Sequence, residues 1–283
     1  MTAIRLGMTN NRAVLIVEGR AIDIETRSDN QFSTDPMKLY EHWDNFGEWA
    51  RQQTLNGDEP TLTNADLQCP VPHPRAVYGI GLNYKDHAEE AGLEMPKQPM
   101  VFTKFPSCIA GPTAEIPLTS NRVDWEAELV VVIGRGGSDI AESDAMSHVA
   151  GYSVGQDISD RRQQFADRPP QFNLGKSATN YGPIGPVVVT TDAFDDPDAL
   201  PLSCEIDGEE VQSSTTANLI FSVTELVSFL SKWTELMPGD VIFTGTPAGV
   251  GSVRDPRRYL IEGEVITTTI PGIGTLTNKC VAK

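Results

Sequence analysis

Positive charge is scarce in this sequence. Its 22 Lys and Arg residues stand against 39 Asp and Glu residues, which gives a formal net charge of −17. An acidic surface repels phosphate backbones and anionic lipid headgroups. We therefore expect no nucleic-acid partner and no role at a membrane. An acidic substrate would need a local cluster of cations.

Cysteines and long apolar runs are scarce as well. The four cysteines form no Cys-x-x-Cys pair, so neither a zinc site nor a disulfide framework is predicted. No apolar run approaches the roughly 18 residues that a membrane-spanning helix needs. The first 20 residues lack the charged-then-apolar order of a signal peptide. We expect a cytoplasmic protein.

The pattern of short apolar runs and turn residues predicts a mixed α+β fold that is mainly β. Residues 4–24 read as a hairpin, and Asp207-Gly208 predicts a second hairpin turn. Thr34-Asp35-Pro36 is typical of a helix start. Residues 58–75 are rich in proline and polar residues. We therefore expect a small N-terminal domain over 1–69 and a larger domain over 70–283.

An acidic pair opens the most apolar strand. The run Leu129–Ile133 is short and β-branched, and it ends at a glycine, which predicts a buried strand. Glu126 and Glu128 precede and enter this run two residues apart, so their side chains leave the strand on one face. A third acid, Asp157, ends a later predicted strand. Three carboxylates without a His or Cys partner suit Mg²⁺ or Mn²⁺, although a bare Glu-x-Glu is also typical of a solvated strand end.

Cations and a histidine offer the rest of a candidate site. His87 and Glu90 are neighbours on a predicted short helix, as an acid–base pair requires, although a surface pair without a role has the same spacing. The spacing of Asp157, Arg161 and Gln164 predicts one helical face. Arg161 with Lys176 would supply positive charge, but an arginine at such a position is also typical of a structural ion pair.

The segment TGTPAGVG (244–251) contains enough glycine for close approach to a ligand. It lacks the Lys-Ser/Thr ending of a P-loop and opens no predicted helix, so it is neither a P-loop nor a dinucleotide fingerprint. An ordinary turn remains the alternative.

Five segments together resemble, in order, the fumarylacetoacetate hydrolase family, in its acylpyruvate and fumarylpyruvate hydrolase branch. They are GLNYKDHAEE (81–90), DWEAELVVVIG (124–134), GYSVGQDISDRRQQ (151–164), GKSATNYGPIGP (175–186) and LMPGDVIFTGTPAGVG (236–251). The resemblance extends from about residue 70 to the C-terminus. Residues 1–69 resemble the small, variable N-terminal domain of the family only loosely.

This resemblance implies a mixed β-sandwich roll, usually a homodimer, with bound Mg²⁺ or Mn²⁺. It implies metal ligands at Glu126, Glu128 and Asp157, and catalytic roles for His87, Glu90 and Lys176. It implies that substrate is contacted by Tyr84, Arg161, Gln164 and Thr246. The segment Arg168-Pro169-Pro170 differs among branches of the family, so the substrate stays open.

The residues and the resemblance favour an enzyme that acts beside the 2-oxo group of a small 2-oxo acid. We expect cleavage of a carbon–carbon bond in an acylpyruvate, with fumarylpyruvate as the first candidate, by a water that His87 deprotonates. Oxaloacetate decarboxylation, isomerisation of a hydroxymuconate-type diacid and hydrolysis of a diketo sugar acid are the alternatives that share the site. The alternative of another class is an inactive metal-binding scaffold.

Overall fold

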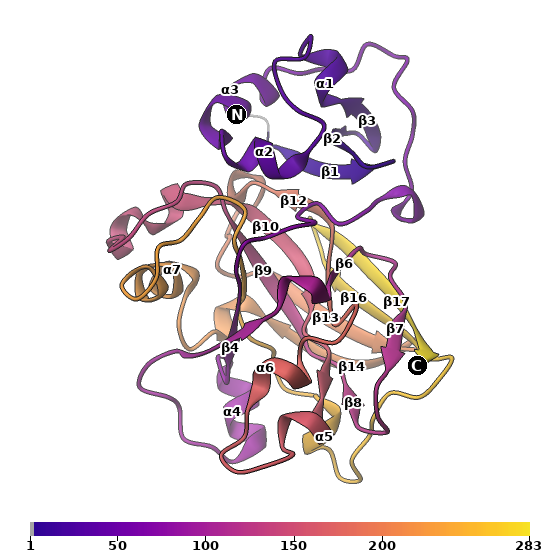
Figure 1. Cartoon of the computed structure of the whole chain (residues 1–283), viewed down its shortest axis with the longest axis vertical. Coiled ribbons are helices and arrows are strands. Elements are labelled where there is room, and N and C mark those ends of the chain that lie inside the picture. Colours follow the sequence, from indigo (N-terminus) through magenta and orange to yellow (C-terminus); the bar gives the residue numbers. More distant parts are fainter. Residues whose placement is uncertain (1–2) are drawn as a thin grey trace.

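The computed structural model describes residues 3–283. The main element of its fold is a ten-stranded sheet (Figure 1). Its order is β3 (Arg20–Asp23), β2 (Arg12–Val17), β1 (Arg5–Thr9), β12 (Gly182–Val189), β10 (Val149–Gln156), β9 (Ala127–Ile133), β15 (Val241–Phe243), β4 (Val77–Gly81) and β5 (Met100–Lys104), with β6 (Ile109–Ala110) beside β12. The two predicted hairpins are present, the first as β1–β2.

A five-stranded sheet packs against the first. Its order is β14 (Glu209–Thr215), β13 (Pro201–Ile206), β16 (Val265–Ile270), β17 (Gly274–Ala282) and β7 (Ile116–Leu118), and a two-stranded sheet joins β8 (Val123–Asp124) to β11 (Ser159–Asp160). Most strand pairs are antiparallel, and the second predicted hairpin turn joins β13 to β14. The predicted mixed, mainly β fold is therefore confirmed.

The strand β9 lies in the core because both of its faces are covered. Leu129, Val131 and Ile133 belong to the apolar cluster between the two large sheets. Val130 and Val132 belong to a second cluster on the other face, which includes side chains of the N-terminal region. Alternate residues of a strand point to opposite faces, so a continuous apolar run is what this position requires.

Short helices connect the strands. They are α1 (Ile24–Arg27), α2 (Pro36–Tyr40), α3 (Trp43–Ala50), α4 (Lys85–Ala91), α5 (Arg161–Gln164), α6 (Phe172–Gly175) and α7 (Val223–Ser231), with 3₁₀ turns η1 (Asn64–Asp66), η2 (Pro106–Cys108), η3 (Glu142–His148), η4 (Thr191–Ala193), η5 (Thr216–Asn218) and η6 (Gly251–Val253). Asp35 caps α2, with Pro36 in its first turn as predicted. Nowhere in residues 3–283 does a helix have the length and apolar character that crossing a membrane requires.

The N-terminal elements β1–β3 and α1–α3 gather at one end of the molecule, and α4, α5 and α6 lie at the other end (Figure 1). Strand β1 pairs with β12, Leu6 opposite Val188, so the large sheet continues into this region. The division at residue 69, the homodimer and the cytoplasmic location stay predictions.

One local prediction is wrong. The spacing of Asp157, Arg161 and Gln164 predicted a common helical face, but α5 begins only at Arg161. The short strand β11 precedes it, and Asp160 caps the helix by accepting hydrogen bonds from the backbone N–H groups of Arg162 and Gln163. Asp157 lies before β11, so its position near Arg161 comes from the strand pairing and not from a helix.

Candidate metal and acid–base site

The three predicted metal ligands meet at the end of two paired strands. Glu128 lies on β9 directly opposite Gly155 of β10. The Asp157 backbone N–H donates to the Glu126 carbonyl at 2.8 Å, and this hydrogen bond holds together the adjoining ends of β9 and β10. Carboxylate oxygens of Glu126, Glu128 and Asp157 all lie within 4.8 Å of one another, and the three side chains are buried. The antiparallel pairing of β9 with β10 therefore builds the acidic cluster.

Lys176 lies between two of these acids. Its Nζ is 2.7 Å from Glu126 Oε2 and 2.6 Å from Asp157 Oδ2, and it donates to Ser159 Oγ at 2.8 Å. Arg161 Nη2 adds an ion pair of 2.6 Å to Glu126 Oε1. Burial alone would raise the pKa of Glu126, but the Lys176 and Arg161 cations outweigh it and lower that pKa to about 2.

A second buried lysine, Lys104 of β5, was not identified from the sequence. Its Nζ lies 2.5 Å from Asp157 Oδ1 and also donates to the backbone carbonyl of Lys176. The two ammonium groups therefore hold the two oxygens of Asp157 separately. Met100, Phe102 and Lys104 alternate along a strand, which places the lysine on the same face as two apolar side chains. This pattern was the signal in the sequence that Lys104 could be buried.

Glu128 differs from its neighbours because no Lys or Arg side chain in the described part of the chain pairs with it. It accepts one hydrogen bond from the Gly245 backbone N–H at 2.7 Å. Gly245 has a φ of +107°, a conformation that only glycine adopts freely. Burial raises the pKa of Glu128 well above its usual range, and the charges of Asp157 and Glu126 raise it further.

These observations test whether a divalent cation fits. Four buried carboxylates, from Asp124, Glu126, Glu128 and Asp157, face three buried cations, from Lys104, Arg161 and Lys176. The cluster thus carries one more negative than positive formal charge, and the excess falls on Glu128. The predicted ligands offer only hard oxygen donors. A hard divalent cation such as Mg²⁺ or Mn²⁺ therefore fits both the charge and the donor set.

Asp124, a second residue missed in the sequence, holds Arg161 in place. Its carboxylate accepts from Arg161 Nε at 2.8 Å and from the backbone N–H groups of Gly251 and Ser252 at 2.8 and 3.0 Å. Arg161 Nη1 in turn donates to Gln164 Oε1 at 2.9 Å. Asp124 therefore connects the arginine to the end of the glycine-rich loop.

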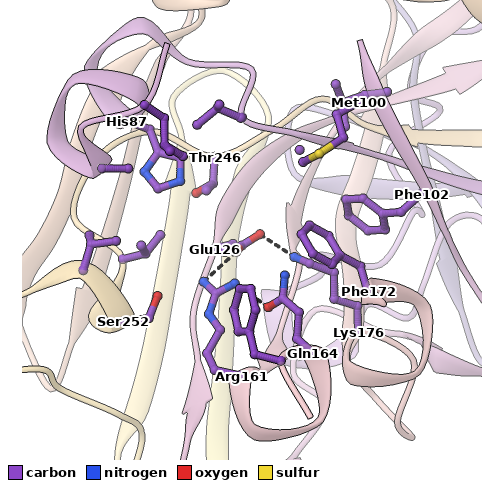
Figure 2. Close-up of a pocket in the computed structure, with 18 residues that line it drawn as sticks. His87, Met100, Phe102, Glu126, Arg161, Gln164, Phe172, Lys176, Thr246 and Ser252 are labelled. Carbon is purple, nitrogen blue, oxygen red and sulfur yellow. Dashed lines mark hydrogen bonds and ion pairs between the residues drawn. The ribbon is translucent and has the colours of Figure 1, made fainter. Parts of the chain in front are cut away.

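A cavity of about 200 Å³ opens beside this cluster, and Figure 2 shows the side chains that line it. Six predicted site residues line it, namely His87, Glu126, Arg161, Gln164, Lys176 and Thr246. His87 and Thr246 lie on one side of Glu126, and Met100, Phe102 and Phe172 lie on the other (Figure 2). Residues from four distant segments thus converge on one cavity.

His87 and Glu90 are in contact on α4, with 3.5 Å between Nδ1 and Oε2. Both oxygens of Glu90 also accept from the Gly249 backbone N–H at 3.1 Å. Gly249 has a φ of +105°, and a Cβ there would lie 2.0 Å from the Val211 carbonyl oxygen, so glycine is required. The glycine-rich loop therefore holds the carboxylate that orients His87.

Tyr84, a predicted substrate contact, does not line this cavity. Its side chain is fully buried, and its hydroxyl has no hydrogen-bond partner among the described residues. Burial raises the pKa of Tyr84, and the charges of Glu128 and Asp86 add to the shift. Its role in substrate binding stays a prediction.

Residues 76–281 match the fumarylacetoacetate (FAA) hydrolase C-terminal family. The chain belongs to the fumarylacetoacetate hydrolase family. This family consists of enzymes, and the expected membership is confirmed. The match begins near the predicted boundary and covers the whole acidic cluster and the cavity.

Individual members of the family are similar over most of the chain. A fumarylacetoacetate hydrolase domain-containing protein 2 homolog of Dictyostelium discoideum is 38% identical over 96% of this chain and 93% of its own length. A mitochondrial oxaloacetate tautomerase of Bos taurus is 43% identical over 78% of this chain and 72% of its own. The crystal structure of a putative HpcE protein from Mycobacterium smegmatis has a TM-score of 0.93 at 48% identity, covering 98% of this chain and 99% of that one.

Proposed function

We propose that this protein catalyses keto–enol proton transfer at the carbon next to the 2-oxo group of oxaloacetate, with Mg²⁺ or Mn²⁺ bound by Glu126, Glu128 and Asp157. One observation carries the proposal. His87, the partner of Glu90, and Glu126, one of the three clustered carboxylates, line the same cavity, where Arg161 and Lys176 provide positive charge. The similarity to oxaloacetate tautomerases, at 43% identity for the bovine protein, supports the choice of substrate.

The residues of this chain suit the proton transfer. His87 would take a proton from C3 of the keto acid, and the C–H electron pair would form the C2=C3 double bond. The π pair of the 2-oxo group would move to its oxygen, which would then take the proton back from His87. Glu90 contacts Nδ1 of His87, which leaves Nε2 as the ring nitrogen that exchanges the proton. Lys176, buried beside Glu126, would stabilise the negative charge that develops on the 2-oxo oxygen.

The bound metal would supply Lewis-acid polarisation of the 2-oxo group. Arg161 would bind the substrate's carboxylate, since Asp124 and Gln164 already orient its guanidinium. Thr246 lines the cavity on the side of His87 and donates its hydroxyl proton to the Ala127 carbonyl at 3.0 Å. That hydroxyl also accepts from Gln212 Nε2 at 2.8 Å, so it could accept a hydrogen bond from an O–H or N–H group of a ligand but could not donate one.

Hydrolysis of an acylpyruvate, with fumarylpyruvate as the first example, is a second candidate. In that reaction His87 would take its proton from a water molecule that attacks the 4-oxo carbon. The observation that favours it is the open mouth of the cavity, where Leu93 and Phe165 are 57% and 56% exposed, so that water reaches the site. Decarboxylation of oxaloacetate needs no such base, and a scaffold needs neither His87 nor Glu90.

Two substrates separate these reactions in one experiment. Metal-loaded protein is mixed with the enol form of oxaloacetate and, separately, with fumarylpyruvate, and the enol absorbance and released pyruvate are followed together. The proposal expects the oxaloacetate enol to disappear faster than without protein, and without release of pyruvate. Pyruvate and fumarate from fumarylpyruvate would indicate the hydrolase instead. Pyruvate from oxaloacetate would indicate the decarboxylase, and no change in either substrate would contradict all three.

A further inference from the structure

One side of the cavity is an aromatic wall that the proposed reaction does not use. It is formed by Phe102 on β5, Phe165 directly after α5 and Phe172 on α6, and all three line the cavity. The ring centroids of Phe102 and Phe172 are 5.7 Å apart at an interplanar angle of 61°, and those of Phe165 and Phe172 are 6.1 Å apart at 71°. The three rings therefore form one continuous edge-to-face row.

The aromatic wall begins directly beside the polar end of the cavity. Lys176 Nζ, which pairs with Glu126 and Asp157, lies 4.9 Å from the centroid of the Phe102 ring. Figure 2 shows Phe102 and Phe172 beside Lys176, on the side of Glu126 that faces away from His87. A small acid held at Lys176 would thus bring its remaining atoms within contact of the rings.

The aromatic wall is also partly open to solvent. Phe165 is 56% exposed and Met100 is 43% exposed, although both line the cavity. Exposed apolar side chains that rim a concave site are typical of a surface that a ligand covers. Arg161 and Lys176 are the only Lys or Arg side chains lining the described cavity, and the proposed function already assigns both to the 2-oxo acid end of the substrate. A charged tail would find no free cation along the rings, whereas an apolar tail would bury them.

We propose that this cavity accepts arylpyruvates, 2-oxo acids with an aromatic ring on C3, and that the ring packs against Phe102, Phe165 and Phe172. The inference rests on the proposed function for the 2-oxo acid end and extends it to the other end of the substrate. An arylpyruvate has an enolisable C3–H bond. The transfer already described for oxaloacetate therefore applies to it with the same balance of one C–H bond broken and one O–H bond formed.

A pair of ligands that differ by one phenyl group tests the aromatic wall by binding alone. Mn²⁺-loaded protein is titrated calorimetrically with pyruvate and with phenylpyruvate. Burial of the ring against three aromatic side chains should make phenylpyruvate bind at least about 10-fold more tightly than pyruvate. Phe172→Ala removes the central ring of the row and should abolish most of this preference, while the affinity for pyruvate stays unchanged.

Two further variants make the test decisive. Phe165→Ala changes a ring that is more than half exposed, so it should weaken phenylpyruvate binding without endangering the fold. Phe229→Ala is the matched control, because Phe229 of α7 forms a similar edge-to-face pair with Trp233, which follows the helix, but does not line the cavity. It should leave the preference intact.

Equal affinity of the wild-type protein for the two ligands would overturn the inference, and so would a preference that survives in both Phe172→Ala and Phe165→Ala. Turnover of oxaloacetate is measured on the same preparations. Turnover of oxaloacetate without a preference for phenylpyruvate would contradict the aromatic subsite but not the proposed function. A phenyl preference without any turnover would remove the proposed function and leave the subsite.

Discussion

Lys104 Nζ lies 2.5 Å from Asp157 Oδ1, and both side chains are buried at the base of the acidic cluster. The same ammonium also donates to the carbonyl of Lys176. Lys104 thus connects one predicted metal ligand to the chain segment that carries the second lysine. We interpret it as a positioning residue, since it does not line the cavity.

Replacement of Lys104 by Met should destabilise the fold strongly. The change keeps the apolar length of the side chain but leaves Asp157 Oδ1 and the Lys176 carbonyl without their buried donor. Removing one partner of a buried ion pair costs about 3–5 kcal/mol, and urea unfolding of the metal-free protein measures this loss. Lys279→Met, the same change at an exposed position of β17, should cost little. Equal losses in the two variants would contradict the role of Lys104.

Binding of Mn²⁺ should release a proton. The pKa of Glu128 is raised by burial and by the neighbouring acids, so the metal-free protein keeps this carboxyl protonated well above the usual range of a glutamate. A cation must displace that proton. The affinity for Mn²⁺ should therefore rise with pH until the pH exceeds the raised pKa of Glu128. Titration calorimetry in two buffers of different ionisation enthalpy counts the released protons. Absence of proton release would show that Glu128 is not the protonated group.

The raised pKa of Glu128 also makes the stability of the metal-free protein depend on pH. The folded metal-free protein binds a proton at Glu128 that the unfolded chain releases at a lower pH. The stabilising contribution is therefore fully present below the ordinary pKa of a glutamate and is lost as the pH rises through the raised one. Glu128→Gln should remove this part of the pH dependence from urea unfolding curves. An unchanged dependence in that variant would assign it to another group.

Asp124→Asn should impair substrate binding. The charged acceptor that aligns Arg161 would be lost, and a hydrogen bond to a charged group contributes roughly 1.5–3 kcal/mol. We therefore expect KM to rise at least about 10-fold. Asp240→Asn is the control, because Asp240 is also buried and accepts backbone N–H groups, from Ala76 and Met237, but does not contact Arg161. A rise in KM of the same size in both variants would indicate a general structural effect.

The sequence predicted those parts of the site that depend on local spacing. Glu128 lies on β9 and Glu126 directly precedes that strand, two residues earlier, while His87 and Glu90 are three apart on a helix, so each pair could be placed from periodicity alone. The mainly β fold could be predicted for the same reason. That the two pairs belong to one site was inferred from the family resemblance.

Contacts between distant segments could not be predicted from spacing. Lys104 reaches Asp157 and Asp124 reaches Arg161 only because separate strands converge, and an isolated Lys or Asp in a strand carries no sign of its partner. The prediction that Asp157 and Arg161 share a helical face was wrong, because the two-residue strand β11 pairs with β8 before the helix starts. The sheet pairing of β1 with β12 is long-range in the same way.

The rate of enol-to-keto conversion of oxaloacetate by His87→Ala tests the central claim most directly. General base catalysis contributes typically 10²–10⁴-fold, so at saturating Mn²⁺ the variant should be slower than the wild-type protein by about that factor. Its affinity for Mn²⁺ should be unchanged, because His87 is not among the predicted ligands. His73→Ala, at an exposed histidine outside the cavity, should keep the wild-type rate. A His87→Ala protein that converts the enol at the wild-type rate would contradict the account.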